Sequence, residues 1–178
     1  PLIGHAFKKV YYDTNLGRQC SQFVKAEDFV VAPDSKDLLT SIRYSHIIQM
    51  PRNDYNRYVQ GGYYLPIKYV GSDYDPAGDI GEQIEGVSSM GDEEHNETVT
   101  LIEMHVYETF DGIDGVVDDE DNEDMVAFPY VVTIDYDSQK IVSIRRNWEE
   151  NDEKKLKLNY FVSYRFLPGI GFYGFGLY

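Results

Sequence analysis

Apolar and polar residues alternate over several short stretches of this chain, which is the pattern of half-buried β-strands. The clearest stretch covers residues 130–136 and is followed by Asp-Ser-Gln-Lys at 137–140 and by a second alternating stretch at 141–145. Two alternating stretches joined by four turn-forming residues predict a β-hairpin. Similar β-prone patterns predict further strands at residues 5–12, 22–31, 41–50, 98–110 and 160–166.

One segment has the features of a helix rather than a strand. Pro51 ends the strand before it and suits the first position of a helix, where a missing N–H is no loss. Residues 52–60 could form that helix, and Gly61-Gly62 can close it. Residues 63–70 return as an extended segment. The sequence therefore predicts an α+β fold of mostly antiparallel strands and hairpins with one or more short helices.

Charge is distributed unevenly along the chain, which has 178 residues and a formal net charge of -15. Residues 71–125 hold 19 acidic side chains and no Lys or Arg, whereas the rest of the chain holds 12 acidic and 16 basic ones. The run at 118–124 predicts a solvated loop, and the spaced glycines of 71–91 predict another. We expect residues 1–178 to form a single β-rich domain with an acidic, loop-rich insertion at about 71–125.

The acidic insertion raises an alternative, which is a divalent-cation-binding module or a metal-dependent enzyme that uses the carboxylates of 71–125. An EF-hand calcium loop needs Gly at its sixth position and Glu at its twelfth. Neither acidic series meets both conditions, because Ile84 stands twelfth from Asp73 and Val116 stands sixth from Asp111. We therefore assign no metal ligand, and a solvated acidic surface is the simpler interpretation.

Other catalytic patterns are weak. The four histidines lack the paired spacing of metal ligands, and Cys20, the only cysteine, has no partner motif. Gly169–Gly174 has the spacing of a dinucleotide-binding loop, but no βαβ unit surrounds it. We assign no catalytic or cofactor-binding residue and expect neither an enzyme nor a cofactor. No apolar run approaches the length of a membrane span, so we expect no membrane partner.

A small basic and aromatic cluster is the candidate contact site for DNA or for a protein partner. Aromatic rings between basic side chains can hold a nucleic-acid backbone. The alternative is a charged loop rim that faces the acidic insertion, and the net charge favours this alternative. The residues of the cluster are Arg145, Arg146, Trp148, Lys154 and Lys155.

Several segments resemble the portal proteins of tailed bacteriophages. They are Phe-Pro-Tyr-Val-Val-Thr-Ile-Asp at 128–135, Ile-Val-Ser-Ile-Arg-Arg-Asn-Trp at 141–148, Tyr-Phe-Val at 160–162 and the Leu-Pro-Gly-x-Gly-Phe-Tyr-Gly-Phe-Gly motif at 167–176. Residues 28–31 and 45–50 are similar to the same family, upstream and in the same order. The stretch at 128–176 is the most specific part of this resemblance.

The resemblance implies a structural, non-catalytic component of a ring of usually twelve subunits at one capsid vertex. Double-stranded DNA passes through such a ring without sequence-specific binding during head assembly, packaging and ejection. The terminase docks on one face, and tail or head-completion adaptor proteins dock later. The protein would belong to the portal vertex of the virion and, during assembly, to the host cytoplasm.

The two ends of the chain suggest an internal, β-rich piece of a larger portal protein. The chain begins at Pro1 and ends in an aromatic-rich tail at 171–178. In the family a helix tends to follow this segment, and long channel helices flank the β-rich region. We therefore expect the tail to be exposed here and to provide packing for a neighbouring helix or subunit through Phe172, Tyr173 and Phe175.

Overall fold

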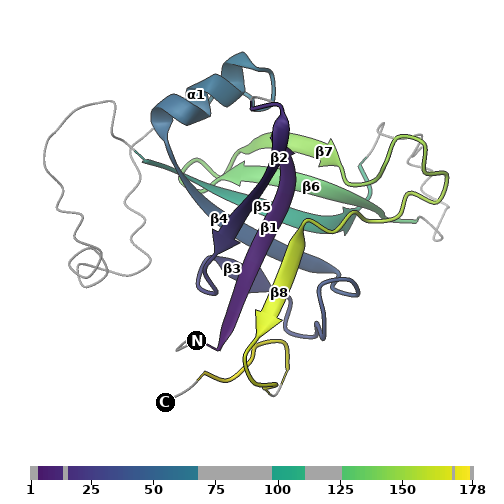
Figure 1. Cartoon of the computed structure of the whole chain (residues 1–178). Helices are drawn as coiled ribbons and strands as arrows, with labels where there is room; N and C mark the ends of the chain where they lie inside the picture. Colours follow the sequence, from purple (N-terminus) through teal and green to yellow (C-terminus); the bar gives the residue numbers. More distant parts are fainter. Residues whose placement is uncertain (1–3, 14–15, 68–97, 111–125, 170, 177–178) are drawn as a thin grey trace, which may run out of the picture. The chain divides into compact units, whose positions relative to one another are not determined.

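The computed structural model describes residues 4–13, 16–67, 98–110, 126–169 and 171–176. Within these ranges the chain forms two sheets of mostly antiparallel strands and a single short helix, as Figure 1 shows. The predicted fold class is therefore confirmed. The acidic insertion at 71–125 lies outside the described residues, except for 98–110.

The first sheet has three strands in the order β2-β1-β8. The central strand β1 (His5–Asp13) pairs in antiparallel register with β2 (Arg18–Val24) on one side and with β8 (Phe161–Arg165) on the other. Figure 1 shows the three strands side by side. Strand β8, near the end of the sequence, thus pairs with β1, near its beginning.

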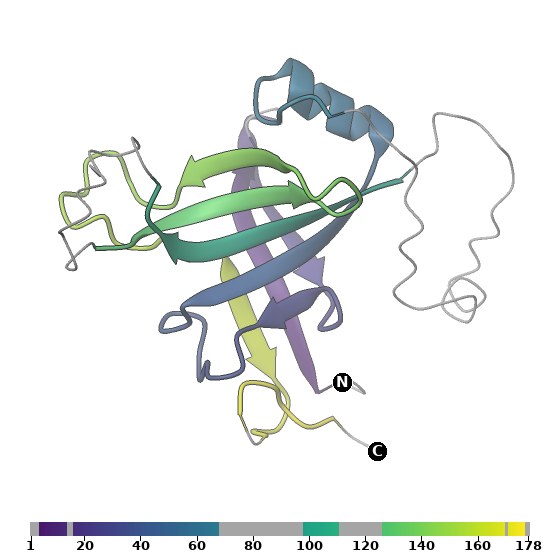
Figure 2. The ribbon, with the colours of Figure 1, turned by 180° about the vertical axis from the view of Figure 1, so that it is seen from behind.

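The second sheet has five strands in the order β3-β4-β5-β6-β7 (Figure 2). Its members are β3 (Phe29–Val31), β4 (Arg43–Pro51), β5 (Thr98–Glu108), β6 (Phe128–Asp135) and β7 (Ile141–Arg146). The turn between β6 and β7 is closed by a hydrogen bond from the Asp135 N–H to the Lys140 carbonyl, at 2.9 Å. This is the hairpin that the alternating pattern predicts.

The chain divides into two compact units, and each is described by itself. Unit 1 comprises Pro1–Ile47, Glu103–Val132 and Ile144–Tyr178, whereas unit 2 comprises Ile48–Ile102 and Thr133–Ser143. The division falls within β4, β5, β6 and β7.

Unit 1 has an aromatic core. The Phe7 ring stacks on Phe29, with ring centroids 4.1 Å apart, and Phe29 lies 4.8 Å from Phe161 and 5.5 Å from Tyr44. All four side chains are at most 1% exposed. Since they come from β1, β3, β4 and β8, this core packs strands of the first sheet against strands of the second. Buried aromatic side chains carry large apolar areas, so they dominate such a core.

Unit 2 contains helix α1 (Arg52–Gln60), which begins after Pro51 and ends at Gly61 as the sequence predicts. Its buried Tyr55 donates its hydroxyl proton to the Leu65 carbonyl at 2.8 Å. The Leu65 N–H in turn donates to the Val142 carbonyl at 2.8 Å. Tyr55 shares an apolar cluster with Val99, Leu101 and Val142.

Two expectations are wrong. The stretch 22–31 is not one strand, because residues 25–28 form a turn in which the Asp28 N–H donates to the Lys25 carbonyl. Strand β2 therefore lies in the first sheet and β3 in the second. The expected exposure of the tail fails at Phe172, which is only 5% exposed because it packs into the core of unit 1.

Candidate functional site

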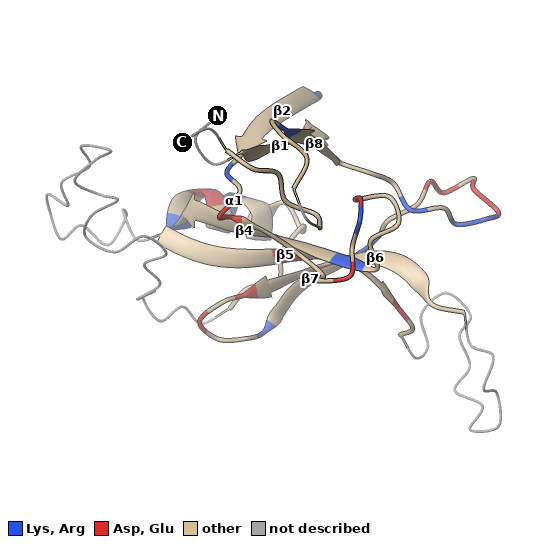
Figure 3. Cartoon of the chain, turned by 90° about the horizontal axis from the view of Figure 1, so that it is seen from below, with Lys and Arg blue, Asp and Glu red and all other residues tan. Residues whose placement is uncertain are grey.

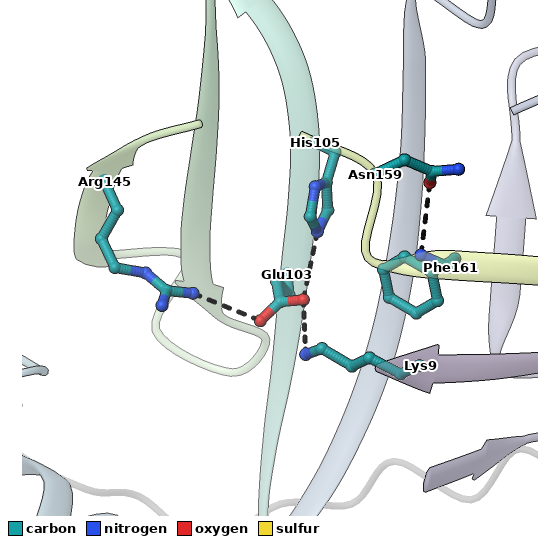
Figure 4. A network of polar contacts seen from close by, with 6 residues as sticks. All are labelled: Lys9, Glu103, His105, Arg145, Asn159 and Phe161. Carbon is teal, nitrogen blue, oxygen red and sulfur yellow. Dashed lines mark hydrogen bonds and ion pairs between the residues drawn. The ribbon is translucent and has the colours of Figure 1, made fainter. Parts of the chain in front are cut away.

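The most unusual polar feature of unit 1 is a buried carboxylate, Glu103 on β5. Figure 4 shows three basic side chains that converge on it. Lys9 Nζ lies 2.7 Å from Glu103 Oε1, His105 Nε2 lies 3.2 Å from the same oxygen, and Arg145 Nη2 lies 3.5 Å from Oε2. We call this group, Lys9, Glu103, His105 and Arg145, the Glu103 network.

The strand periodicity explains how these side chains meet. Side chains at positions i and i+2 of a strand point to one face, so Glu103 and His105 share the buried face of β5. Lys9 comes from β1 and Arg145 from β7. The Lys9 side chain is 12% exposed and that of Glu103 is 5%, whereas that of Arg145 is 52%. The Lys9–Glu103 pair is therefore the buried part of the network.

The ionisation of the network follows from its surroundings. Burial alone raises the pKa of Glu103, but the Lys9 ammonium and the hydrogen bond from His105 outweigh burial and hold this pKa well below its usual range. Burial lowers the pKa of His105 despite the neighbouring carboxylate. At neutral pH, Glu103 is therefore ionised and His105 is neutral, with its Nε2–H donating to the carboxylate.

A second buried histidine, His46 on β4, belongs to the same core. It is 4% exposed and lies edge-on to the Phe161 ring, with centroids 5.5 Å apart. Burial, followed by the Lys9 charge, lowers its pKa to about 4. His46 is therefore also neutral near pH 7.

The geometry of the Glu103 network suits a structural ion pair. Both carboxylate oxygens face donors from the protein itself, and the carboxylate is buried. An ionised group that is buried must be paired and hydrogen-bonded to be tolerated, and this one is. The network joins β1, β5 and β7 within unit 1.

Metal binding was a separate hypothesis. Among the residues that the structure describes, no group of three or more His, Cys, Asp or Glu side chains is arranged to hold a metal ion. The acidic run at 118–124 and the loop at 71–91 lie outside those residues. The cation-binding alternative for these segments therefore stays a hypothesis.

The predicted basic and aromatic cluster is only partly assembled. Lys155 Nζ lies 3.9 Å from the Phe128 ring centroid and 5.5 Å from that of Trp148. The Trp148 ring also lies 5.3 Å from that of Tyr130 in an edge-to-face contact. Lys155 thus makes cation–π contacts within the protein, with the rings of Phe128 and Trp148.

The other members of the cluster are placed differently. The Arg145 guanidinium reaches the Glu103 carboxylate, and Arg146 and Lys154 are exposed. The charged loop at 149–157 carries acidic and basic side chains together (Figure 3). The carboxylate of Asp152 accepts hydrogen bonds from the N–H groups of Lys154 and Leu156. The prediction that the cluster contacts DNA or a partner stays untested, and the side chains of Arg145, Trp148 and Lys155 make contacts within the protein.

The aromatic tail folds back on unit 1. Phe172 stacks on His5 at 5.2 Å, and the Tyr173 hydroxyl donates to the Phe29 carbonyl at 2.9 Å. Phe175 is 55% exposed and forms an isolated bridge with Leu167. Phe175, and in part Tyr173, thus keep exposed surface for the predicted packing, whereas Phe172 does not.

The tail glycines have a steric explanation. A Cβ at Gly169 would lie 2.2 Å from the Tyr173 carbonyl oxygen, and one at Gly174 would lie 2.7 Å from the Leu167 carbonyl oxygen. Gly171 has φ +91°, which side chains rarely adopt. The Gly-x-Gly-x-x-Gly spacing therefore serves a close backbone turn.

The sequence interpretation missed Lys9, Glu103 and His105 as a group. One signal could have found Glu103, because it continues the apolar series of Val99 and Leu101 at the same strand parity. A charged residue in such a series predicts a buried charge that needs a partner.

No protein-family model matches the chain, and no match is found among the curated proteins. The portal resemblance is therefore carried by the quoted segments alone. Within the described ranges, no helix has the length and apolar character needed to cross a lipid bilayer.

Proposed function

We propose that this chain is a structural, non-catalytic part of a bacteriophage portal protein. The observation that carries the proposal is the run of portal-like segments at 128–176, with the shorter ones at 28–31 and 45–50 in the same order. In this function the domain forms part of the wall of a ring through which double-stranded DNA enters and leaves the capsid. Terminase and head-completion proteins are its expected partners.

The positions of the portal-like residues support this proposal. Tyr130, Asn147, Phe161 and Phe172 all belong to the quoted segments, and each is at most 5% exposed in unit 1. Three glycines of the 167–176 motif, Gly169, Gly171 and Gly174, occupy positions that a side chain would obstruct or strain. The resemblance thus involves residues that build the core and its closing turn, which are the residues a shared fold would require.

The charge of the chain also suits a channel wall. A net charge of -15 disfavours tight binding of DNA through its phosphates, and a DNA channel has to let duplex pass.

Electron microscopy of the full-length product of the gene tests the proposal. Negative staining should show closed rings with a central hole, and native mass spectrometry should give about twelve subunits. A small, discrete monomer at micromolar concentration would contradict the proposed function. Rings that lack a central hole would also contradict it.

A further inference from the structure

A buried histidine, His5 at the start of β1, is the point where the aromatic tail meets the core of unit 1. We call residues 171–176 of the tail the tail turn. The His5 ring is 6% exposed and stacks on two rings, with centroids 4.4 Å from Phe7 and 5.2 Å from Phe172. The Tyr173 ring meets the His5 ring edge-on at 5.6 Å. Two consecutive residues of the tail turn therefore pack directly on a titratable side chain.

Hydrogen bonds of two kinds anchor the tail turn to the rest of unit 1. Some end on main-chain carbonyls, those of Phe29 and Leu167, each at 2.9 Å from its donor in the tail turn. Another runs from the Gly174 N–H to Nδ1 of His5, at 3.4 Å. A carbonyl keeps its charge at every pH, whereas an imidazole changes its charge between pH 5 and 8. The His5 anchor can therefore respond to protons.

The Gly174 hydrogen bond defines the tautomer of the neutral His5 ring. A ring nitrogen that accepts a hydrogen bond carries no proton, so the neutral ring holds its proton on Nε2. This Nε2 atom is buried and has no hydrogen-bond partner among the described residues. A protonated ring has two N–H donors and no acceptor. It would therefore turn an N–H towards the Gly174 N–H, and neither of its donors would be satisfied.

The charges around His5 oppose its protonation as well. Arg165 of β8 lies opposite His5 in the antiparallel pairing of β1 with β8. The Arg165 guanidinium lies over the Phe172 ring, 5.3 Å from its centroid, and donates to the Lys36 carbonyl at 2.8 Å. Burial raises the pKa of Tyr173, so the hydroxyl of the tail turn stays neutral. In the described part of the chain, the charge that acts on the His5 ring is therefore the positive charge of Arg165.

These surroundings couple the charge of His5 to the position of the tail turn. Burial, followed by the Arg165 charge, lowers the pKa of His5 while the tail turn is docked. A ring that the tail turn no longer covers would return towards the ordinary pKa of 6.5. The docked state is therefore fully favoured above pH 6.5. It loses this advantage as the pH falls from 6.5 towards the lower pKa of the docked state.

The tail turn is the element that can yield when His5 gains a proton. Strand β1 is held on both sides, by β2 and by β8. The tail turn is held by an isolated bridge between Leu167 and Phe175, together with the anchors given above. Segments with few hydrogen bonds open at a lower free energy than the central strand of a sheet. Protonation should therefore release the tail turn before it unfolds unit 1.

We propose that His5 is a proton-operated latch, which holds the tail turn on unit 1 when the ring is neutral and releases it when the ring is protonated. Release uncovers Phe172, which is 5% exposed in the docked state. The expected packing of Phe172 against a neighbouring helix or subunit thereby becomes possible at acidic pH. The latch goes beyond the proposed function and does not depend on it, because it uses contacts within unit 1 alone.

The size of the effect follows from the linkage between proton binding and docking. For each pH unit below 6.5, the ratio of docked to released tail turn falls by up to about tenfold, until the pKa of the docked state is reached. Between pH 7.5 and 5.5 the ratio should therefore fall by about three- to tenfold. The burial of Phe172 contributes equally at both pH values, so it does not change this factor.

Hydrogen exchange of the full-length protein, followed by mass spectrometry, tests the latch. The amide protons of Gly174 and Phe175 both donate in the docked state, so the exchange of a peptide that contains 171–176 reports release. Wild type is compared with His5→Gln, in which the amide oxygen can accept the Gly174 N–H but no charge is gained. Both proteins are measured at the same pH, so that the intrinsic pH dependence of exchange cancels. The rate of wild type divided by that of His5→Gln should rise at least threefold from pH 7.5 to pH 5.5.

Two further variants make the result specific. His46→Gln is the matched control, because it removes a buried histidine that packs on Phe161 in the same core. This control should keep the pH dependence of wild type. His5→Phe retains a stacked ring and should lose the pH dependence as His5→Gln does, so it serves if His5→Gln does not fold.

Three results would overturn the latch. The first is a rate ratio between wild type and both His5 variants that is equal at the two pH values. The second is a loss of the pH dependence in His46→Gln, because the acid response would then belong to the core as a whole. The third is an acid response of equal size in peptides of β1, β4 and β8. A full-length protein that forms no ring would contradict the proposed function and leave the latch unaffected.

Discussion

The buried Lys9–Glu103 pair allows a quantitative prediction for the variant Lys9→Met. Lys9 Nζ lies 2.7 Å from Glu103 Oε1, and neither side chain is more than 12% exposed. Methionine keeps most of the volume but removes the charge, so the carboxylate loses its nearest cation. His105 is neutral near pH 7 and Arg145 is half exposed, so neither replaces that cation. Breaking a buried pair in this way costs about 3–5 kcal/mol of unfolding free energy.

Two further variants identify the cause of the loss. Lys8→Met removes the exposed neighbouring lysine and should change the free energy of unfolding by no more than about 0.5 kcal/mol. The double variant Lys9→Met/Glu103→Leu removes both charges and should recover most of the stability, because apolar side chains of similar volume can replace a buried pair. Urea denaturation followed by tryptophan fluorescence measures all three.

The pH dependence provides an independent check of the same pair. The pKa of Glu103 is lowered in the folded state, so its contribution to the free energy of unfolding is fully present above the ordinary carboxyl value of 4.5 and is lost progressively as the pH falls from that value through the lower pKa of the folded state. In Lys9→Met the pKa of Glu103 rises, so the difference in the free energy of unfolding between this variant and wild type should shrink as the pH is lowered. A loss for Lys9→Met that stays within about 1 kcal/mol of the Lys8→Met value would refute the reasoning.

Three further predictions concern single sites. The pKa of His46 is lowered to about 4, so the free energy of unfolding of wild type should fall by up to about 3 kcal/mol more than that of His46→Gln between pH 6.5 and 4. Urea denaturation at several pH values measures this difference, and parallel pH curves for the two proteins would contradict it. Gly4 and Gly17 both have positive φ, but a Cβ at Gly4 would lie 2.2 Å from backbone atoms and one at Gly17 would meet nothing. Gly4→Ala should therefore lower the thermal midpoint clearly more than Gly17→Ala, and equal midpoints would be inconsistent with the turn described. Lys155→Ala should shift the tryptophan emission and lower the free energy of unfolding by about 0.5–2 kcal/mol, whereas Lys154→Ala should leave the emission unchanged. An emission shift in both variants would argue against the cation–π contact.

Local patterns were sufficient for much of the fold. The alternation at 130–136 and 141–145 predicts the β6–β7 hairpin, and Pro51 with Gly61 marks both ends of α1. These features depend on neighbouring residues, whose preferences are visible in the sequence. The prediction of one strand at 22–31 was wrong because its apolar ends suggested continuity across the short turn at 25–28.

Contacts between distant segments could not be predicted in this way. Lys9 and Glu103 are 94 positions apart, and nothing in the composition of either strand specifies the other. The burial of Phe172 likewise depends on Phe7, at the other end of the chain. The pairing of β1 with both β2 and β8 likewise joins segments from the two ends of the chain, which no local pattern specifies.

Imaging of the full-length protein tests the central claim most directly. Negative-stain electron microscopy at micromolar concentration, with native mass spectrometry of the same sample, measures whether the subunits form a closed ring. The portal account predicts rings with a central hole and a mass of about twelve subunits. Particles of one small subunit, with no ring at any concentration examined, would contradict it.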